Sequence, residues 1–300
     1  MIRRIAVPFC LVSLGATPLA GQELQGREGS RFTWSERIPS GQWLRVYGIN
    51  GRIEVTPATG DAAEVVGEKV LRRGRPEDIA FEIRRVSDGI VICAIIHDDD
   101  ECDDDGIRSR GRRNDRNERR VNFTVRVPRG VKVAAQSGNG DVRVDGVTAE
   151  VRAASGNGDV SVSTTGGPVN ASSGNGEVSV TRAAGPVRAS SGNGDVVVAT
   201  TRGPVTASSG NGDVEVSMDA IEDVPEDMEF SSGNGTVTVT VPENFNGELV
   251  ATTGSGKFVS DFPLTIRGRI DPRRVRATIG RGGRRITIST GNGDVELKKK

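Results

Sequence analysis

Short stretches in which apolar and polar residues alternate recur along most of the chain. In the central part, each 18-residue unit contains two of them, as at Val160 and Val162 and again at Val169 and Ala171. Residues two apart face the same side of a β-strand, so each unit predicts two short strands with one apolar face each. Gly-Asn-Gly and Gly-Pro sequences separate the alternating stretches and predict the turns between them.

One phrase, Ser-Gly-Asn-Gly-Asp-Val, sets the period of this alternation. The phrase and its near-copies place asparagine at Asn139, Asn157, Asn175, Asn193, Asn211, Asn234 and Asn292. The intervals between the first five are all 18 residues. Such an internal repeat is typical of stacked-repeat architectures. The pattern predicts an all-β protein, a β-solenoid (β-helix-like) with coils of about 18 residues and two short strands per coil.

An antiparallel β-meander is the alternative, because Asn-Gly is also a strong hairpin signal. A single sheet of this size would, however, leave one apolar face uncovered. In a solenoid, the valine and alanine faces of the two strands meet in a closed core, and equivalent strands stack about 4.8 Å apart. The asparagines then lie on one another and can share side-chain hydrogen bonds. We therefore expect the solenoid, with the asparagines as a structural turn ladder.

The remaining segments differ from the repeats in composition. Residues 1–21 have a basic start, a short apolar run and a small-residue exit, which is typical of a secretory signal peptide. Residues 22–96 contain further alternating stretches and predict an N-terminal β section. Residues 97–120 are an acidic block followed by an arginine-rich block, for which we expect a disordered insertion loop. The solenoid repeats should cover 121–297, and 298–300 form a basic tail.

Charge and apolar content indicate where the protein is located. The 40 Lys and Arg residues balance the 40 Asp and Glu residues, so no net field favours nucleic acid. No other long apolar run follows the signal sequence, so we expect no integral membrane segment after its cleavage. The sequence predicts an exported protein in the periplasm or outside the cell, at the surface of a bacterium.

Cys93 and Cys102 are the two cysteines outside the predicted signal peptide. Two cysteines in an exported chain usually pair, and the loop between them is short enough to close. We therefore predict a disulfide between them. The alternative, a zinc site, would need more ligands than these cysteines and His97, the single histidine, supply.

The phrase Ser-Gly-Asn-Gly-Asp-Val-x-Val, repeated behind a signal sequence, resembles the bacterial putative-adhesin β-strand-repeat family of unknown function. The chain is also similar to the head domains described as auto-transporter-adhesin-like. The resemblance covers 121–297 well and the stretch from Trp43 to Val55 weakly. It implies an exported β-solenoid with an adhesin-like role, and it brings no catalytic residues.

Candidate chemistry within the repeats is sparse. Asp141 and its equivalents form an acidic column, but their register differs from that of calcium-binding nonapeptide repeats, so we expect them to accept hydrogen bonds from turn amides. The acidic block 98–105 resembles an EF-hand loop only in its early positions. Thr236, Thr238 and Thr240 would supply a single rung of an ice-binding array.

A catalytic triad that needs a histidine cannot be assembled in the repeats, because the only histidine lies in the charged insertion. We expect a non-enzymatic protein without cofactors, an adhesin-like or envelope scaffold that contacts an unidentified protein or glycan. A carbohydrate-binding or carbohydrate-active β-helix is the first alternative. A calcium-binding repeat protein is the second.

Overall fold

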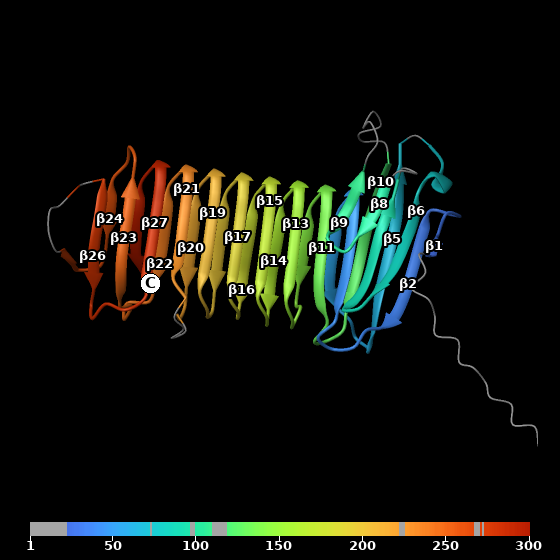
Figure 1. Ribbon diagram of the computed structural model, residues 1–300, viewed down its shortest axis with the longest axis horizontal. Helices are drawn as coiled ribbons and strands as arrows, with labels where there is room; N and C mark the ends of the chain where they lie inside the picture. Colours follow the sequence, from blue (N-terminus) through green and yellow to red (C-terminus); the bar gives the residue numbers. More distant parts are fainter. Residues whose placement is uncertain are drawn as a thin grey trace, which may run out of the picture.

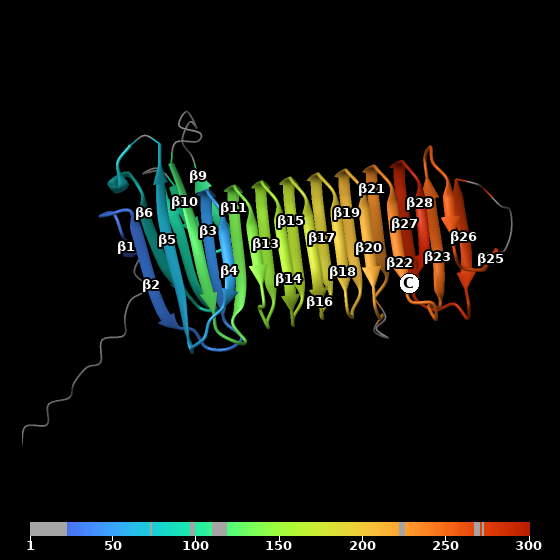
Figure 2. The ribbon, with the colours of Figure 1, turned by 180° about the vertical axis from the view of Figure 1, so that it is seen from behind.

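The computed structural model describes residues 23–72, 74–96, 100–109, 119–221, 226–266, 271 and 273–300. The predicted signal peptide, His97 and most of the arginine-rich block lie outside these residues. Within the described ranges the regular elements are strands, apart from one 3₁₀ turn at Pro76–Asp78. Two long sheets lie opposite each other and form a rod (Figures 1 and 2).

The strands of these two sheets are not ordered as they are in the chain. Sheet A contains, in spatial order, β1 (Glu23–Gln25), β6 (Ala80–Val86), β7 (Gly89–Ile95), β3 (Trp43–Asn50), β11 (Lys132–Asn139), β13 (Val151–Asn157), β15 (Val169–Asn175), β17 (Val187–Asn193), β19 (Val205–Asn211), β21 (Met228–Asn234), β27 (Arg285–Asn292), β23 (Gly247–Thr253), β26 (Arg274–Ile279) and β25 (Leu264–Ile266). Sheet B contains β2 (Arg31–Arg37), β5 (Ala62–Leu71), β10 (Arg119–Val127), β4 (Ile53–Pro57), β12 (Val142–Asp145), β14 (Val160–Thr165), β16 (Val178–Ala183), β18 (Val196–Thr200), β20 (Val214–Met218), β22 (Val237–Val241), β28 (Val295–Lys299) and β24 (Phe258–Ser260).

The central strands stack in parallel, one coil on the next. β13 pairs in parallel with β11 and β15, and β14 pairs in parallel with β12 and β16. Each coil is therefore one strand of sheet A, a Gly-Asn-Gly turn and one strand of sheet B. The predicted β-solenoid is confirmed, and the antiparallel meander is wrong for the repeats, because equivalent strands lie side by side in register.

At both ends the stacking order departs from the chain order. β3 and β4 form a coil directly below β11 and β12, so the two sheets continue from the N-terminal section into the repeats without a break. β27 and β28 insert between the coil of β21 and β22 and the coil of β23 and β24. Antiparallel strands close each end, namely β1, β2, β5 and β6 at one end and β25 and β26 at the other.

The core between the sheets is narrow in the middle and aromatic at its ends. Inward valines and alanines such as Val178, Val180 and Ala189 are buried. At the N-terminal end Phe32 stacks on Phe81 with ring centroids 4.2 Å apart, and the edge-on Phe123 ring lies 5.9 Å from that of Phe81. At the other end two phenylalanine rings meet at 6.4 Å. Large rings thus cover the last small side chains, which an open stack would expose to water.

A buried serine column holds neighbouring coils together. The inward serine of each phrase donates a hydrogen bond to a turn carbonyl of the preceding coil, as from Ser191 to Gly176 at 2.8 Å. The equivalent donors are Ser137, Ser155, Ser173, Ser209, Ser232, Thr253 and Thr290. Sequence reasoning gave this serine no role, although its recurrence at an inward position was the available signal.

The expectation of disorder for the insertion is wrong for its described acidic part. β8 (Asp100–Asp103) and β9 (Gly106–Ser109) form an antiparallel hairpin. Residues 100–105 of the block that resembled an EF-hand loop belong to this hairpin, so they lie in strands and a tight turn. It forms regular structure because Cys102 and its neighbours pack on the outer face of sheet A, in a small cluster with Tyr47 and Cys93.

We predict that Ser191→Ala lowers the free energy of unfolding by about 1 kcal/mol, because it removes the hydrogen bond to the partly buried turn carbonyl of Gly176. Ser190→Ala, one residue away on the exposed face, is the matched control and should change it by less than about 0.5 kcal/mol. Urea unfolding followed by circular dichroism measures both values. Equal effects of the two substitutions would contradict a structural role for the inward hydroxyl.

Candidate binding surface

The predicted asparagines lie in one column along the turn edge of the rod. Each Nδ2 donates to the Oδ1 of the preceding asparagine, for example from Asn157 to Asn139 and from Asn175 to Asn157, both at 2.8 Å. The same bond links all seven predicted positions. The column also includes Asn50 at its start, and Ser255 donates to Asn292 at its end.

The acidic column runs beside the asparagines. Oδ1 of Asp159 accepts the backbone N–H of Glu177 at 2.9 Å, and Oδ1 of Asp213 accepts that of Thr236 at 2.7 Å. These are the hydrogen bonds to turn amides that the sequence favoured over a cation site. Among the described residues, no group of three or more His, Cys, Asp or Glu side chains is placed to hold a metal ion.

The threonines considered for an ice-binding array do not continue into one. Thr238 lies on sheet B between Glu215 and Glu296. Its hydroxyl donates to the Glu296 carboxylate at 3.3 Å. The neighbouring rungs are therefore charged rather than threonine.

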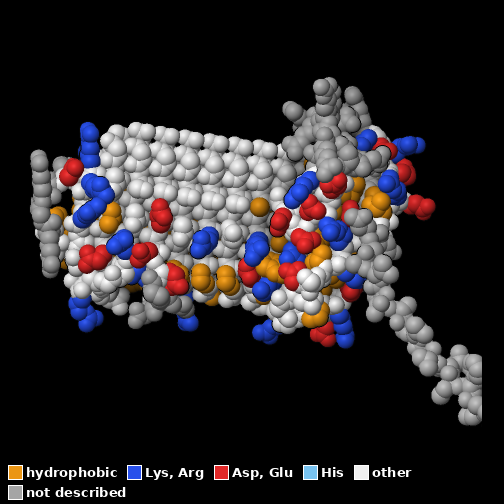
Figure 3. Space-filling view, in the orientation of Figure 1, with side chains coloured by type: hydrophobic (Ala, Val, Ile, Leu, Met, Phe, Trp, Pro, Cys, Tyr) orange, Lys and Arg blue, Asp and Glu red, His pale blue; other side chains and the backbone are white. Residues whose placement is uncertain are grey.

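The outer face of sheet A carries a regular row of hydroxyl groups, which we call the serine face. Its members stand directly opposite one another on successive strands: Ser172, Ser190, Ser208, Ser231 and Ser289. Neighbouring strands lie about 4.8 Å apart, so the hydroxyls repeat at this interval. Figure 3 shows a broad band without charged or apolar side chains along the upper part of the rod.

At the N-terminal end of this face, the hairpin of β8 and β9 forms a shelf over sheet A. The sulfur atoms of Cys93 and Cys102 are bonded, with their Cα atoms 5.9 Å apart, and tie β8 to β7. Glu82 stands directly opposite Cys93 and is buried. Its Oε1 has no hydrogen-bond partner among the described residues. Burial therefore raises the pKa of Glu82, against the opposing effect of nearby Arg84.

Tyr47 and Arg45 belong to β3 and lie on sheet A beside the hairpin turn. The Tyr47 hydroxyl donates to the carbonyl oxygen of Asp104 in the hairpin turn at 2.7 Å. Burial raises the pKa of Tyr47 to about 12. Arg45 donates two hydrogen bonds to Asp88, at 3.0 and 2.6 Å, and these bonds lower the pKa of that carboxyl. The Arg152 guanidinium lies 4.5 Å from the Trp43 ring centre.

A concavity of about 170 Å³ opens where the shelf meets the serine face. Its lining combines Tyr47, Gln136, Arg152, Asn170 and the acidic hairpin turn. Donors, acceptors and both charge signs thus converge beside a flat hydroxyl surface. This arrangement can bind polar ligands, and none of its parts provides a nucleophile with an adjacent base.

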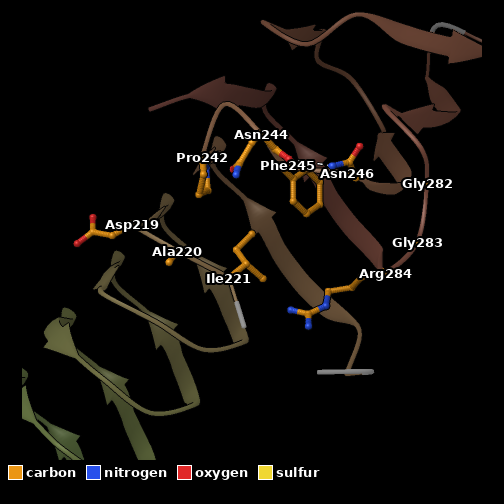
Figure 4. A pocket seen from close by; sticks show the side chains of 10 residues that line it. All are labelled: Asp219, Ala220, Ile221, Pro242, Asn244, Phe245, Asn246, Gly282, Gly283 and Arg284. Atoms are coloured by element: carbon orange, nitrogen blue, oxygen red, sulfur yellow. Dashed lines mark hydrogen bonds between the residues drawn. The ribbon is translucent and has the colours of Figure 1, made fainter. Parts of the chain in front are cut away.

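A second concavity, of about 410 Å³, lies among loops at the C-terminal half of the rod (Figure 4). Ile221, Pro242 and Phe245 supply apolar groups, whereas Asp219 and Asn244 supply polar ones. The next residues after Ile221, 222–225, lie outside the described part of the chain. We therefore assign this concavity no ligand.

A third concavity, of about 530 Å³, lies at the C-terminal end of the outer face of sheet A. It is formed by β23, β25, β26 and β27, and we call it the arginine groove after Arg276 and Arg285. No sequence motif predicted this groove, because its residues come from strands that follow no regular 18-residue interval. Within the described part of the chain, no helix has the length and apolar character needed to cross a membrane.

We predict that Tyr47 deprotonates at a pH of about 12, rather than at the usual 10.0, in the folded protein. It is the only tyrosine, so the ultraviolet absorbance of tyrosinate measures this residue alone. In a Cys93→Ser, Cys102→Ser variant, the midpoint should move toward 10.0, because a released hairpin no longer buries the ring. Circular dichroism must show the fold intact at each pH. A midpoint near the usual value in the oxidised protein would refute the docked shelf.

We also predict that Glu82→Gln stabilises the protein at pH 7 by on the order of 1 kcal/mol. A carboxyl whose pKa is raised by folding contributes stability below its unfolded pKa and loses it as the pH rises through the folded pKa. The advantage of the variant should therefore vanish below the usual value of 4.5. Melting temperatures at several pH values measure this, with exposed Glu68→Gln as control. A difference in melting temperature between Glu82→Gln and the unsubstituted protein that stays the same at every pH would contradict the raised pKa of Glu82.

Comparison with known proteins places these features in a family. No curated protein matches the chain significantly. One similar solved structure is a "putative adhesin" from Bacteroides fragilis NCTC 9343, with 13% identity, 91% of this chain and 99% of that chain covered, and a TM-score of 0.45. Another is a "putative cell adhesion protein" from Clostridium sporogenes ATCC 15579, with 10% identity, 90% and 100% coverage and a TM-score of 0.29. The family model described as Toastrack DUF4097 matches residues 106–298, and the chain therefore belongs to this family.

Proposed function

We propose that the protein is an exported, non-enzymatic solenoid that acts as an adhesin-like or scaffold protein at the bacterial cell envelope. Its location would be the periplasm or the cell surface. The observation that carries the proposal is the serine face, a flat row of hydroxyls at a constant interval along the rod. A rigid surface that offers the same group repeatedly suits an extended partner, either a glycan or a protein.

The rest of the surface supports contact rather than catalysis. Polar concavities lie at both ends of the serine face, so a long partner could be held at more than one point. The balanced charge gives no reason to propose nucleic acid as a partner. The signal sequence and the disulfide between Cys93 and Cys102 support export to an oxidising compartment. We also propose that the solenoid is related to the head domains of auto-transporter-like adhesins.

We predict that the mature chain binds a glycan or an envelope protein through sheet A without releasing reducing ends from any polysaccharide. Ser190→Trp should weaken this binding at least tenfold, because the ring interrupts the flat row. Ser179→Trp, at an outward position on sheet B, is the matched control and should bind normally. Glycan arrays and pull-downs from envelope fractions measure binding, and a reducing-end assay measures cleavage.

Three results would contradict the proposal. Cytoplasmic location of the native protein in cell fractionation would remove the envelope role. Released reducing ends would favour a carbohydrate-active β-helix. Equal binding by the two tryptophan variants would exclude the serine face as the contact surface.

A further inference from the structure

The floor of the arginine groove is a short stretch of β23 between two strands that come from elsewhere in the chain. Arg285 of β27 stands opposite Glu248, and Arg276 of β26 stands opposite Val250 on the other side. Glu248 and Val250 are two residues apart and point to the same face. The two arginines therefore flank the β23 floor diagonally, with their Cα atoms about 12 Å apart from strand geometry.

Both arginines are exposed, and the acid on the groove floor, Glu248, is bonded to a different group. The Glu248 carboxylate accepts hydrogen bonds from the Thr278 hydroxyl at 3.1 and 3.2 Å. Arg274 adds a further exposed cation on β26. Figure 3 shows Lys and Arg side chains, with Asp and Glu side chains among them, at the end of the rod where Figure 1 places β23, β26 and β27. The groove thus offers guanidinium groups to a ligand.

The remaining lining groups narrow the chemistry of that ligand. Thr265, Thr278 and Thr287 supply hydroxyls around the groove, and half-buried Val250 supplies an apolar patch on its floor. Guanidinium groups bind carboxylates and other oxyanions. Glu248, however, disfavours a small multivalent anion and accepts hydrogen bonds from ligand hydroxyls. A saccharide with one acid group on each sugar unit, several hydroxyls and an apolar C–H face satisfies all of these groups.

We propose that the arginine groove binds an acidic saccharide of the uronate class. Its carboxylate lies against Arg276 and Arg285, its hydroxyls face Glu248 and the threonines, and its C–H face lies on Val250. This inference rests on the proposed function, since it names the partner class for one end of the same face. The serine face leads away from the groove along the rod and gives a uronate chain further hydroxyl contacts.

Isothermal titration of the mature chain with trigalacturonate tests the proposal. Arg276→Ala and Arg285→Ala should each weaken binding at least tenfold, and binding should fall as salt is added. Arg143→Ala, an exposed arginine on sheet B, is the matched control and should change binding less than twofold. The neutral methyl ester of the same trisaccharide should bind at least tenfold more weakly, and inorganic phosphate should not compete. Circular dichroism confirms folding of every variant.

Each contrary result has a distinct meaning. Trigalacturonate binding that survives Arg276→Ala and Arg285→Ala combined in one variant, or no binding at all, overturns the uronate site. Competition by phosphate at concentrations similar to the saccharide would reduce the groove to a simple anion site and would also overturn it. If glycan arrays still show binding that Ser190→Trp abolishes, the proposed function stands without this site. If no glycan or envelope protein binds any surface, the proposed function fails as well.

Discussion

Close, in-register approach of successive Gly-Asn-Gly turns is the constraint on which the whole rod depends. A Cβ atom at Gly192 would lie 2.5 Å from the carbonyl oxygen of Gly174 in the preceding coil, so only glycine permits this spacing. Gly194 has a φ of 153°, a conformation that side chains disfavour. With the backbones this close, the asparagine and serine columns on either side of the glycines can each bond to the coil below. The repeated Ser-Gly-Asn-Gly sequence therefore determines the spacing between coils, their register and the hydrogen bonds of their polar side chains.

The same constraint explains why stacking order differs from chain order at the C-terminal end. The coil of β27 and β28 contains a copy of the phrase with Asn292, in which Thr290 replaces the serine, and stacks directly on the coil that contains Asn234. The coil of β23 and β24 has Ser255 in place of asparagine. It lies outermost, where no further asparagine has to bond to it. The coil whose turn carries the asparagine therefore lies inside the stack, although the coil of β23 and β24 comes earlier in the chain.

Stacking also separates what is invariant from what is available for binding. The inward side chains and the turn residues pack against or bond to neighbouring coils. Outward side chains do not have to pack against the neighbouring coil in this way, so these positions vary along sheet A and include serine, threonine, arginine and glutamate. At the two ends, where irregular strands and the disulfide-linked hairpin adjoin the sheet, these outward side chains form concavities with mixed charge. The rod provides position, and its irregular ends provide chemical variety.

The sequence by itself determined the repeating part of this protein. Alternation fixed the two strands per coil, the interval between Asn139 and Asn211 fixed the register, and the spacing of two cysteines indicated the bond seen between Cys93 and Cys102. The strands and their register follow from local periodicity, since identical units present identical faces to each other. Only the tertiary structure decided that an acidic hairpin docks on sheet A and that Arg276 and Arg285 flank Glu248. Those pairings join segments that lie outside the regular 18-residue interval, and they depend on which surfaces are left to cover at the ends of the stack.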